Sequence, residues 1–209
     1  MNLKKVWDDA YHTTKKTIPR RVERLPKAVL YGDVPTFMEL PYAHTKSDLV
    51  GVDVAFLGAA EIDRHGNVNV SKFGSHIAGC GGFINISQNA KKVVFCCTFT
   101  TGGLKTKIED GKLNIIQEGK IKKFVKDVEQ ITFSGEYARQ INNQEVLYVT
   151  ERAVFKLNST GLKLIEIAPG IDIEKDILNL MDFEVEIADN IHKMDSKIFN
   201  ANLMNLEIS

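Results

Sequence analysis

From Val52 onward the sequence alternates short, β-branched apolar runs with glycine turns, and this alternation restricts the fold to one built on a sheet. The runs "VDVAFLG", "NVNVS" and "KKVVFCCTFT" each predict a strand. The segment 145–170 predicts three successive strands with a turn at 158–161, and Asp110-Gly111 is typical of a hairpin turn. We therefore expect a sheet whose central strands are buried.

A helix is predicted at 172–181, because its apolar residues repeat at helical spacing and Asp172 can cap the first turn. The stretch "FEVEIA" that follows alternates like a strand. Together these patterns predict an α/β fold, with an open mixed sheet flanked by helices.

The first 51 residues differ in composition from the rest. Four of the five prolines lie in the first 41 residues, and residues 1–30 contain eight Lys or Arg against three Asp or Glu. The basic run "KKTIPRRVERLPK" lacks interleaved aromatic residues, which favours a solvated arm over a nucleic-acid site. We expect two parts: an irregular, basic, proline-containing arm (1–51) and a folded domain (52–209).

The overall charge and hydropathy exclude several classes of partner. Lys plus Arg and Asp plus Glu are both 27, so no net charge attracts the protein to nucleic acid or to an anionic membrane. No apolar run approaches the length of about 20 residues that spans a bilayer. The N-terminus lacks the apolar region of a signal peptide, so we expect a cytoplasmic protein.

The cysteines and histidines do not predict a metal site or a disulfide framework. Three cysteines without a secretion signal are typical of reduced thiols, and we expect the adjacent Cys96 and Cys97 to be buried on opposite faces of a strand. The five histidines are scattered, with no metal-binding spacing, and His76 is interpreted as a core or surface residue.

The stretch "IAGCGGFINIS" places Gly79, Gly81 and Gly82 directly before the apolar Phe83. It is not the G-x-G-x-x-G pattern of a dinucleotide site, since Ile84 stands where the third glycine would be. Glycine admits positive φ and lets another group approach the main chain. The loop is thus either a tight turn or a site at which backbone N–H groups point at a ligand oxygen.

Five ordered stretches favour a ligand site and leave the tight turn as the alternative. "DRHGNVNVSKFG", "IAGCGGFINISQNAKKVVFCCTFTTGGLK", "VEQITFSGEYA", "EVLYVTERAVFKL" and "LIEIAPGIDIEKDIL" resemble the C-terminal half of the family I coenzyme A-transferases, most closely the propionate/acetate type. The resemblance extends from about residue 57 to residue 199, and "GCGGF" (79–83) matches the G-x-G-G-F loop of that family.

The resemblance implies a transferase that moves CoA between short-chain acyl-CoAs and carboxylates such as acetate or propionate. In such enzymes a glutamate attacks the thioester, and a tetrahedral oxyanion forms at each step. The resemblance assigns oxyanion stabilisation and thioester binding to Gly79, Gly81, Gly82 and Phe83. Coenzyme A would be a substrate, with no permanently bound cofactor and no metal. A homo-oligomer is left open.

The glutamate nucleophile of the family, in an E-x-G-x-x-G segment, has no match in this sequence. Glu61 is followed by Ile62, Asp63 and Arg64, and Glu23 and Glu39 lie in unrelated surroundings. We therefore assign no nucleophile. Without it we expect the chain to be inactive alone, and a separate chain carrying the missing N-terminal half is left open as a partner.

Residues 1–57 resemble a different family, the N-terminal segment of the agmatinase-like ureohydrolases, through "TIPRRVERLPKAVLYGDVPTFMELPYAHTKSDLVGVDVAFLG". The D-x-H-x-D and D-x-D motifs that hold manganese in those enzymes do not occur here. Three functions thus stay open: a CoA-transferase domain of a hybrid or fragmentary chain, a non-catalytic binding or assembly module or inert hybrid, and a ureohydrolase fragment.

Overall fold

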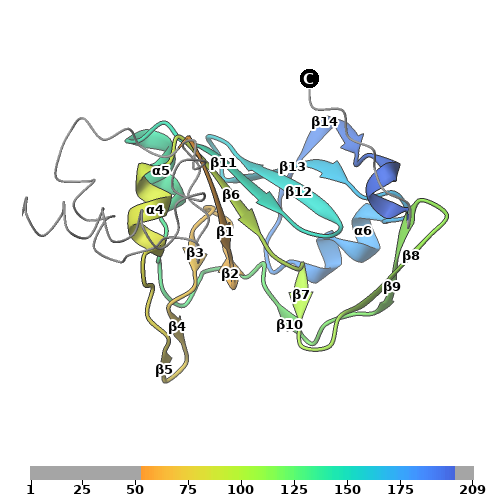
Figure 1. The fold of residues 1–209 in the computed structure, drawn as a ribbon, viewed down its shortest axis with the longest axis horizontal. Helices are drawn as coiled ribbons and strands as arrows, with labels where there is room; N and C mark the ends of the chain where they lie inside the picture. The colour runs from red at the N-terminus through yellow and green to blue at the C-terminus, as the bar shows by residue number, and fades with distance from the viewer. Residues whose placement is uncertain (1–52, 201–209) are drawn as a thin grey trace, which may run out of the picture.

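The computed structural model describes residues 53–200, and its centre is one six-stranded sheet with the order β1-β6-β11-β12-β13-β14 (Figure 1). Strands β1, β6 and β11 are parallel, β12 and β13 each run antiparallel to the preceding strand, and β14 is parallel to β13. The predicted open mixed sheet is confirmed. Its strands are β1 (Val54–Gly58), β6 (Lys92–Cys96), β11 (Glu145–Val149), β12 (Ala153–Leu157), β13 (Leu162–Ile167) and β14 (Glu186–Lys193).

The three parallel strands end at the same edge of the sheet. Gly58, Cys96 and Val149 are register partners and are the last residues of β1, β6 and β11. Two short helices pack against these strands: α4 (Phe83–Asn89) contacts β1, and α5 (Gly135–Gln140) contacts β11. In Figure 1 the carboxyl ends of β1 and β6 point toward the bottom of the view.

Four two-stranded sheets surround the central sheet. The hairpin β8–β9 projects at the right of Figure 1, and its turn at Asp110 (φ 52) and Gly111 (φ 70) is left-handed at both residues, as predicted. The pairs are β2 (Glu61–Ile62) with β3 (Val68–Asn69), β4 (Lys72–Phe73) with β5 (His76–Ile77), β7 (Thr100–Thr101) with β10 (Ile121–Lys122), and β8 (Lys105–Glu109) with β9 (Lys112–Gln117).

The turn between β12 and β13 also follows the prediction. The side chain of Asn158 accepts hydrogen bonds from the backbone N–H groups of Thr160 and Gly161, and the backbone N–H of Asn158 donates to the carbonyl of Gly161. Asparagine is favoured in turns because its side chain can hydrogen-bond the backbone two residues later and so imitate a backbone turn.

Three predicted elements were wrong in extent. The strand predicted at 91–100 ends at Cys96, because Phe99 turns inward to stack on Phe124 while its N–H donates to Glu151. The predicted strand "NVNVS" is only the two residues of β3, and the one at 183–188 instead begins at Glu186.

The helix predicted at 172–181 is divided into α6 (Ile173–Asp176) and the 3-10 helix η1 (Leu178–Leu180). The break lies at Ile177, whose φ of −125° is not helical and whose side chain is fully buried. Asp172 caps α6 as predicted, because its side chain accepts a hydrogen bond from the N–H of Lys175. A second 3-10 helix, η2 (Ser196–Phe199), follows β14.

The buried aromatic residues form two clusters in the core. Phe95 packs against Phe83, Phe133 and Tyr148, with ring centroids 5.0–5.9 Å apart. Phe99, Phe124 and Phe155 form the second cluster. The predicted N-terminal arm (1–51) lies outside the described residues, so the two-part division stays a prediction. Within residues 53–200, no helix is long and apolar enough to cross a membrane.

Candidate functional site

The glycine loop has two residues that require glycine for their backbone conformation. Gly79 has φ 77° and Gly81 has φ 51°, both in the left-handed region. Gly82, with φ −82°, is the N-cap of α4 and has a conformation open to any residue. An added Cβ at Gly79 would meet nothing within 4 Å. Packing therefore does not explain the glycine there.

Hydrogen bonds divide the loop amides into two groups. The N–H groups of Ala78 and Gly79 both donate to the carbonyl of Ser71, at 2.9 and 3.2 Å. The N–H of Phe83 donates to the carbonyl of Cys80 at 3.0 Å. The amides of Gly81 and Gly82 have no acceptor within residues 53–200. The amide of Gly79 is already used, so these two are the glycine donors still available to a ligand.

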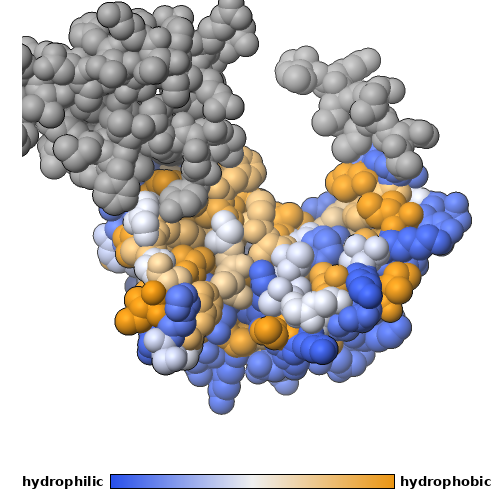
Figure 2. All heavy atoms as spheres, turned by 60° about the horizontal axis from the view of Figure 1, so that its bottom comes forward, coloured by the Kyte–Doolittle hydropathy of each residue, from blue (hydrophilic) through white to orange (hydrophobic). Residues whose placement is uncertain are grey.

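A cavity of about 730 Å³ opens in front of this loop. It lies where β1 ends, and the carboxyl edge of parallel strands is the usual position of ligand sites in α/β folds. Figure 2 brings this edge forward and shows hydrophobic residues gathered over the half that carries the loop. The lining residues are Phe56, Leu57, Gly58, Ala59, Ala60, Val70, Ala78, Gly79, Cys80, Gly81 and Phe83.

Phe83 closes the inner side of the cavity. It is 6% exposed and stacks on Phe95 with ring centroids 5.9 Å apart, so its position is fixed by the core. Phe56, on β1, is 47% exposed and lies at the outer side. The four predicted site residues therefore belong to one loop, and three of them (Gly79, Gly81 and Phe83) line the cavity.

All three cysteines are free. Cys80 is half-buried in the cavity wall. Cys96 is exposed at the end of β6, so the prediction that both adjacent thiols are buried was wrong for this residue. Burial raises the pKa of the Cys97 thiol to about 11, against a smaller lowering by the positive charge of Lys123. Cys97 is thus protonated and unreactive near neutral pH.

Glu61 is held by structural hydrogen bonds. Its Oε2 accepts from the side-chain amide of Asn69 at 2.7 Å and from the N–H of Glu129 at 3.1 Å. Glu23 and Glu39 lie outside the described residues. Among residues 53–200, no group of three His, Cys, Asp or Glu side chains is arranged to hold a metal ion.

A buried arginine that the sequence analysis missed lies in the turn between β11 and β12. Arg152 is 0% exposed, donates to both carboxylate oxygens of Glu118 at 2.8 and 3.0 Å, and donates to Glu151 at 2.7 Å. Its guanidinium lies over the ring of Phe99. The only sequence signal is a charged pair inside the apolar run "VLYVTERAVF". Arg152 fixes the turn that joins β11 to β12.

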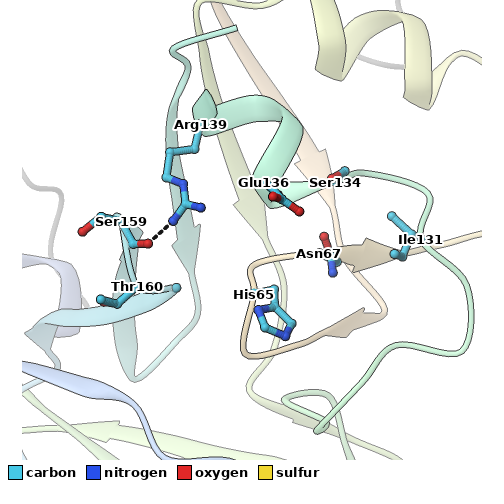
Figure 3. A pocket seen from close by; sticks show the side chains of 9 residues that line it. His65, Asn67, Ile131, Ser134, Glu136, Arg139, Ser159 and Thr160 are labelled. Atoms are coloured by element: carbon cyan, nitrogen blue, oxygen red, sulfur yellow. Dashed lines mark hydrogen bonds between the residues drawn. The ribbon is translucent and has the colours of Figure 1, made fainter. Parts of the chain in front are cut away.

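A second pocket, of about 370 Å³, lies between α5 and the β12–β13 turn (Figure 3). Arg139 donates to the carbonyls of Asn158, at 2.9 Å, and Ser159, so its guanidinium clamps that turn. His65 and Glu136 also line the pocket. The polar groups here mostly hold the backbone, and the pocket lacks the unpaired amides of the glycine loop.

Comparison with known proteins gives close relatives, although no family model matches the chain. Acetate CoA-transferase YdiF of Escherichia coli K12 is 54% identical over 149 residues, which are 71% of this chain and 28% of that protein. Caffeate CoA-transferase of Acetobacterium woodii is 53% identical over 155 residues, 72% of this chain and 29% of that protein. The C-terminal part of this chain is homologous to the family I CoA-transferases.

Solved structures of CoA-transferases share this fold. The acyl-CoA transferase YdiF of E. coli O157:H7, as a thioester complex with CoA, matches with a TM-score of 0.76 and 49% identity over 81% of this chain and 32% of that one. Glutaconate CoA-transferase of Acidaminococcus fermentans, at 16% identity and a TM-score of 0.54, is similar in fold alone. This chain spans less than a third of the length of the curated relatives that it matches.

Proposed function

We propose that this chain is the acyl-CoA-binding part of a CoA-transferase, and that the loop Gly79–Phe83 stabilises the oxyanion at the thioester carbonyl. The observation that carries the proposal is the open cavity in front of two left-handed glycines, with the Gly81 and Gly82 amides free of any acceptor in the described chain. We propose short-chain acyl-CoAs and acetate or propionate as substrates, in the cytoplasm. The names of the acetate and caffeate relatives support a carboxylate acceptor.

The proposed chemistry needs a nucleophilic glutamate. Its carboxylate attacks the thioester carbonyl, and the tetrahedral oxyanion collapses to a mixed anhydride as the CoA thiolate leaves. The thiolate then attacks the glutamyl carbonyl and releases the acyl group as a carboxylate, which leaves a glutamyl–CoA thioester. The acceptor acid reverses these steps. Each oxyanion donor contributes about 3–4 kcal/mol to such a transition state.

We propose that this glutamate comes from the part of the relatives that the chain does not match, on the same or another polypeptide. A non-catalytic binding module is the second candidate, and one observation favours it. Glu61, Glu118 and Glu151 near the strand ends all have carboxylate oxygens already bound by protein donors. We therefore expect the purified chain alone to exchange no CoA between propionyl-CoA and acetate, and borohydride to trap no glutamyl–CoA adduct.

A chimera tests the proposed function. In it, residues of this chain replace the matched 149 residues of the E. coli K12 relative, which keeps the rest of that enzyme. We expect CoA exchange between acetyl-CoA and labelled propionate. A folded chimera that binds acyl-CoA without exchange would support the binding module instead, and a folded chimera that does neither would overturn the proposal.

A further inference from the structure

We propose that Lys123 forms a binding site for a substrate carboxylate at the carboxyl edge of β1 and β6, beside the cavity of the glycine loop. Binding of a small carboxylate at this position is independent of catalysis. Its identification as the site of the acceptor acid rests on the proposed function.

The backbone holds Lys123 firmly in place. Its carbonyl accepts a hydrogen bond from the N–H of Ile62 at 2.8 Å, and the carbonyl of Ile62 accepts from Val125 at 2.9 Å. Phe124, between them, is 0% exposed and packs in the second aromatic cluster. A ligand-binding side chain needs a fixed backbone position, and the buried Phe124 fixes the backbone next to Lys123.

The ammonium group of Lys123 lies over the ends of two parallel strands. Its Nζ donates to the carbonyl of Ala59 at 3.1 Å, and Ala59 both follows β1 and lines the cavity. Its charge also acts on the thiol of Cys97, which directly follows β6. The cation is therefore at the edge where a ligand of the cavity would present its polar end.

This lysine lacks the carboxylate partner that several neighbouring lysines have. Lys122 pairs with Asp182 at 2.7 Å, and Lys72 pairs with Glu129 at 3.4 Å. No carboxylate within residues 53–200 forms an ion pair with Lys123. An ammonium group has three donors, and the carbonyl of Ala59 takes one. A half-buried cation with free donors is suited to donate a charge-assisted hydrogen bond to a carboxylate ligand.

Glu151 is a candidate partner for the charge of Lys123, because both residues act on Cys97. Its Oε1 accepts from Arg152 at 2.7 Å and its Oε2 from the N–H of Phe99 at 2.8 Å. Both oxygens already have partners, so Glu151 does not supply the missing contact. If Lys123 only balanced the charge of Glu118 and Glu151 around Arg152, it would stabilise the fold and bind no anion.

The test is a titration of the full chain with sodium acetate or propionate, monitored by amide NMR. Sodium chloride keeps the ionic strength constant. We expect saturable shifts at Ala59, Cys97 and Lys123. Lys123→Gln should weaken binding about tenfold or more. The matched control is Lys126→Gln, which removes an exposed lysine three residues along and should leave the affinity unchanged.

Shifts that fail to saturate, or that chloride reproduces, would overturn the proposal and mark an adventitious ion only. Unchanged acetate affinity in Lys123→Gln, with a lowered melting temperature, would overturn it in favour of a charge-balancing role. In the chimera, Lys123→Gln should raise the KM for the carboxylate more than the KM for acyl-CoA. Acetate binding that depends on Lys123 in an inactive chimera would leave the binding site standing and count against the proposed function alone.

Discussion

The glycine loop and the turn at Asp63–Gly66 use glycine for opposite reasons. Around the turn, glycine is required because other atoms occupy the space of a side chain: a Cβ at Gly135 would overlap the carbonyl of His65, and one at Gly161 would overlap that of Arg64. At Gly79 a Cβ would meet nothing within 4 Å. Packing therefore does not require glycine at Gly79, and only its left-handed φ does.

The two regions also differ in whether their polar groups have hydrogen-bond partners. In the turn, the buried carboxylate of Asp63 accepts hydrogen bonds from the N–H groups of His65 and Asn67 and from the side-chain amide of Asn67. At the carboxyl edge, the amides of Gly81 and Gly82 and two donors of Lys123 have no acceptor in the described chain. Satisfied polar groups stabilise a fold, whereas unsatisfied ones at an open cavity are free for a ligand.

The largest expected effect comes from removing a buried polar side chain whose hydrogen bonds are all made within the protein. Arg152→Met should lower the free energy of unfolding by about 3–5 kcal/mol, because the carboxylates of Glu118 and Glu151 would lose their buried partner. The matched control is Arg64→Met, whose ion pair with Asp127 is exposed at both ends and is worth about 0–1 kcal/mol. Urea unfolding measures both, and equal losses would refute a special role for the buried pair.

The next effect compares the two kinds of glycine directly. Gly135→Ala should cost about 3 kcal/mol, because the new Cβ collides with backbone. Gly79→Ala should cost only about 1–2 kcal/mol, which is the strain of a left-handed alanine. Thermal unfolding separates them by several degrees. A Gly79→Ala loss as large as that of Gly135→Ala would mean that the loop is packed, against our description.

The smallest expected effect is in the pH dependence of stability. Burial raises the pKa of Glu118, but hydrogen bonds from Arg152 and Thr100 outweigh it and hold the pKa below the ordinary value of 4.5. A carboxyl with a depressed folded pKa stabilises the fold above its unfolded pKa and loses this contribution as the pH falls through the folded pKa. The stability difference between wild type and Glu118→Gln should therefore be full at pH 7 and shrink below about pH 4.5. Urea unfolding at pH 7 and pH 3.5 would reveal it, and a pH-independent difference would count against the depressed pKa.

Local patterns predicted the strands and turns whose reasons lie within a few residues. The β-branched runs predicted β1, β11, β12 and β13. The turns at Asp110-Gly111 and Asn158–Gly161 adopt conformations that these residue types favour. The helix at 172–181 was divided because Ile177 must reach the core, a tertiary demand that periodicity does not contain.

The site was only partly accessible from sequence. The glycine loop stands out in the sequence because positive φ and close approach need a particular residue type, but its assignment as a site came from the resemblance to CoA-transferases and stays a prediction. Lys123 could not, because it is one of several lysines in "GKIKKFVK", and only the fold puts it over the end of β1. Arg152 was missed for the same reason, since its partner Glu118 is 34 residues away.

The central claim is that the glycine loop presents its amides to a thioester oxygen, and the most direct measurement is the turnover of the chimera carrying Gly81→Ala. We expect turnover to fall about a hundredfold, on the scale of one lost oxyanion donor, with a much smaller change in the KM for acyl-CoA. The matched control is Gly74→Ala in the β4–β5 hairpin, which has a similar left-handed φ of 57° and open space around it. It should lower the melting temperature equally and leave turnover per folded molecule unchanged. If Gly81→Ala behaves like this control, the loop is a structural turn and the site assignment is wrong.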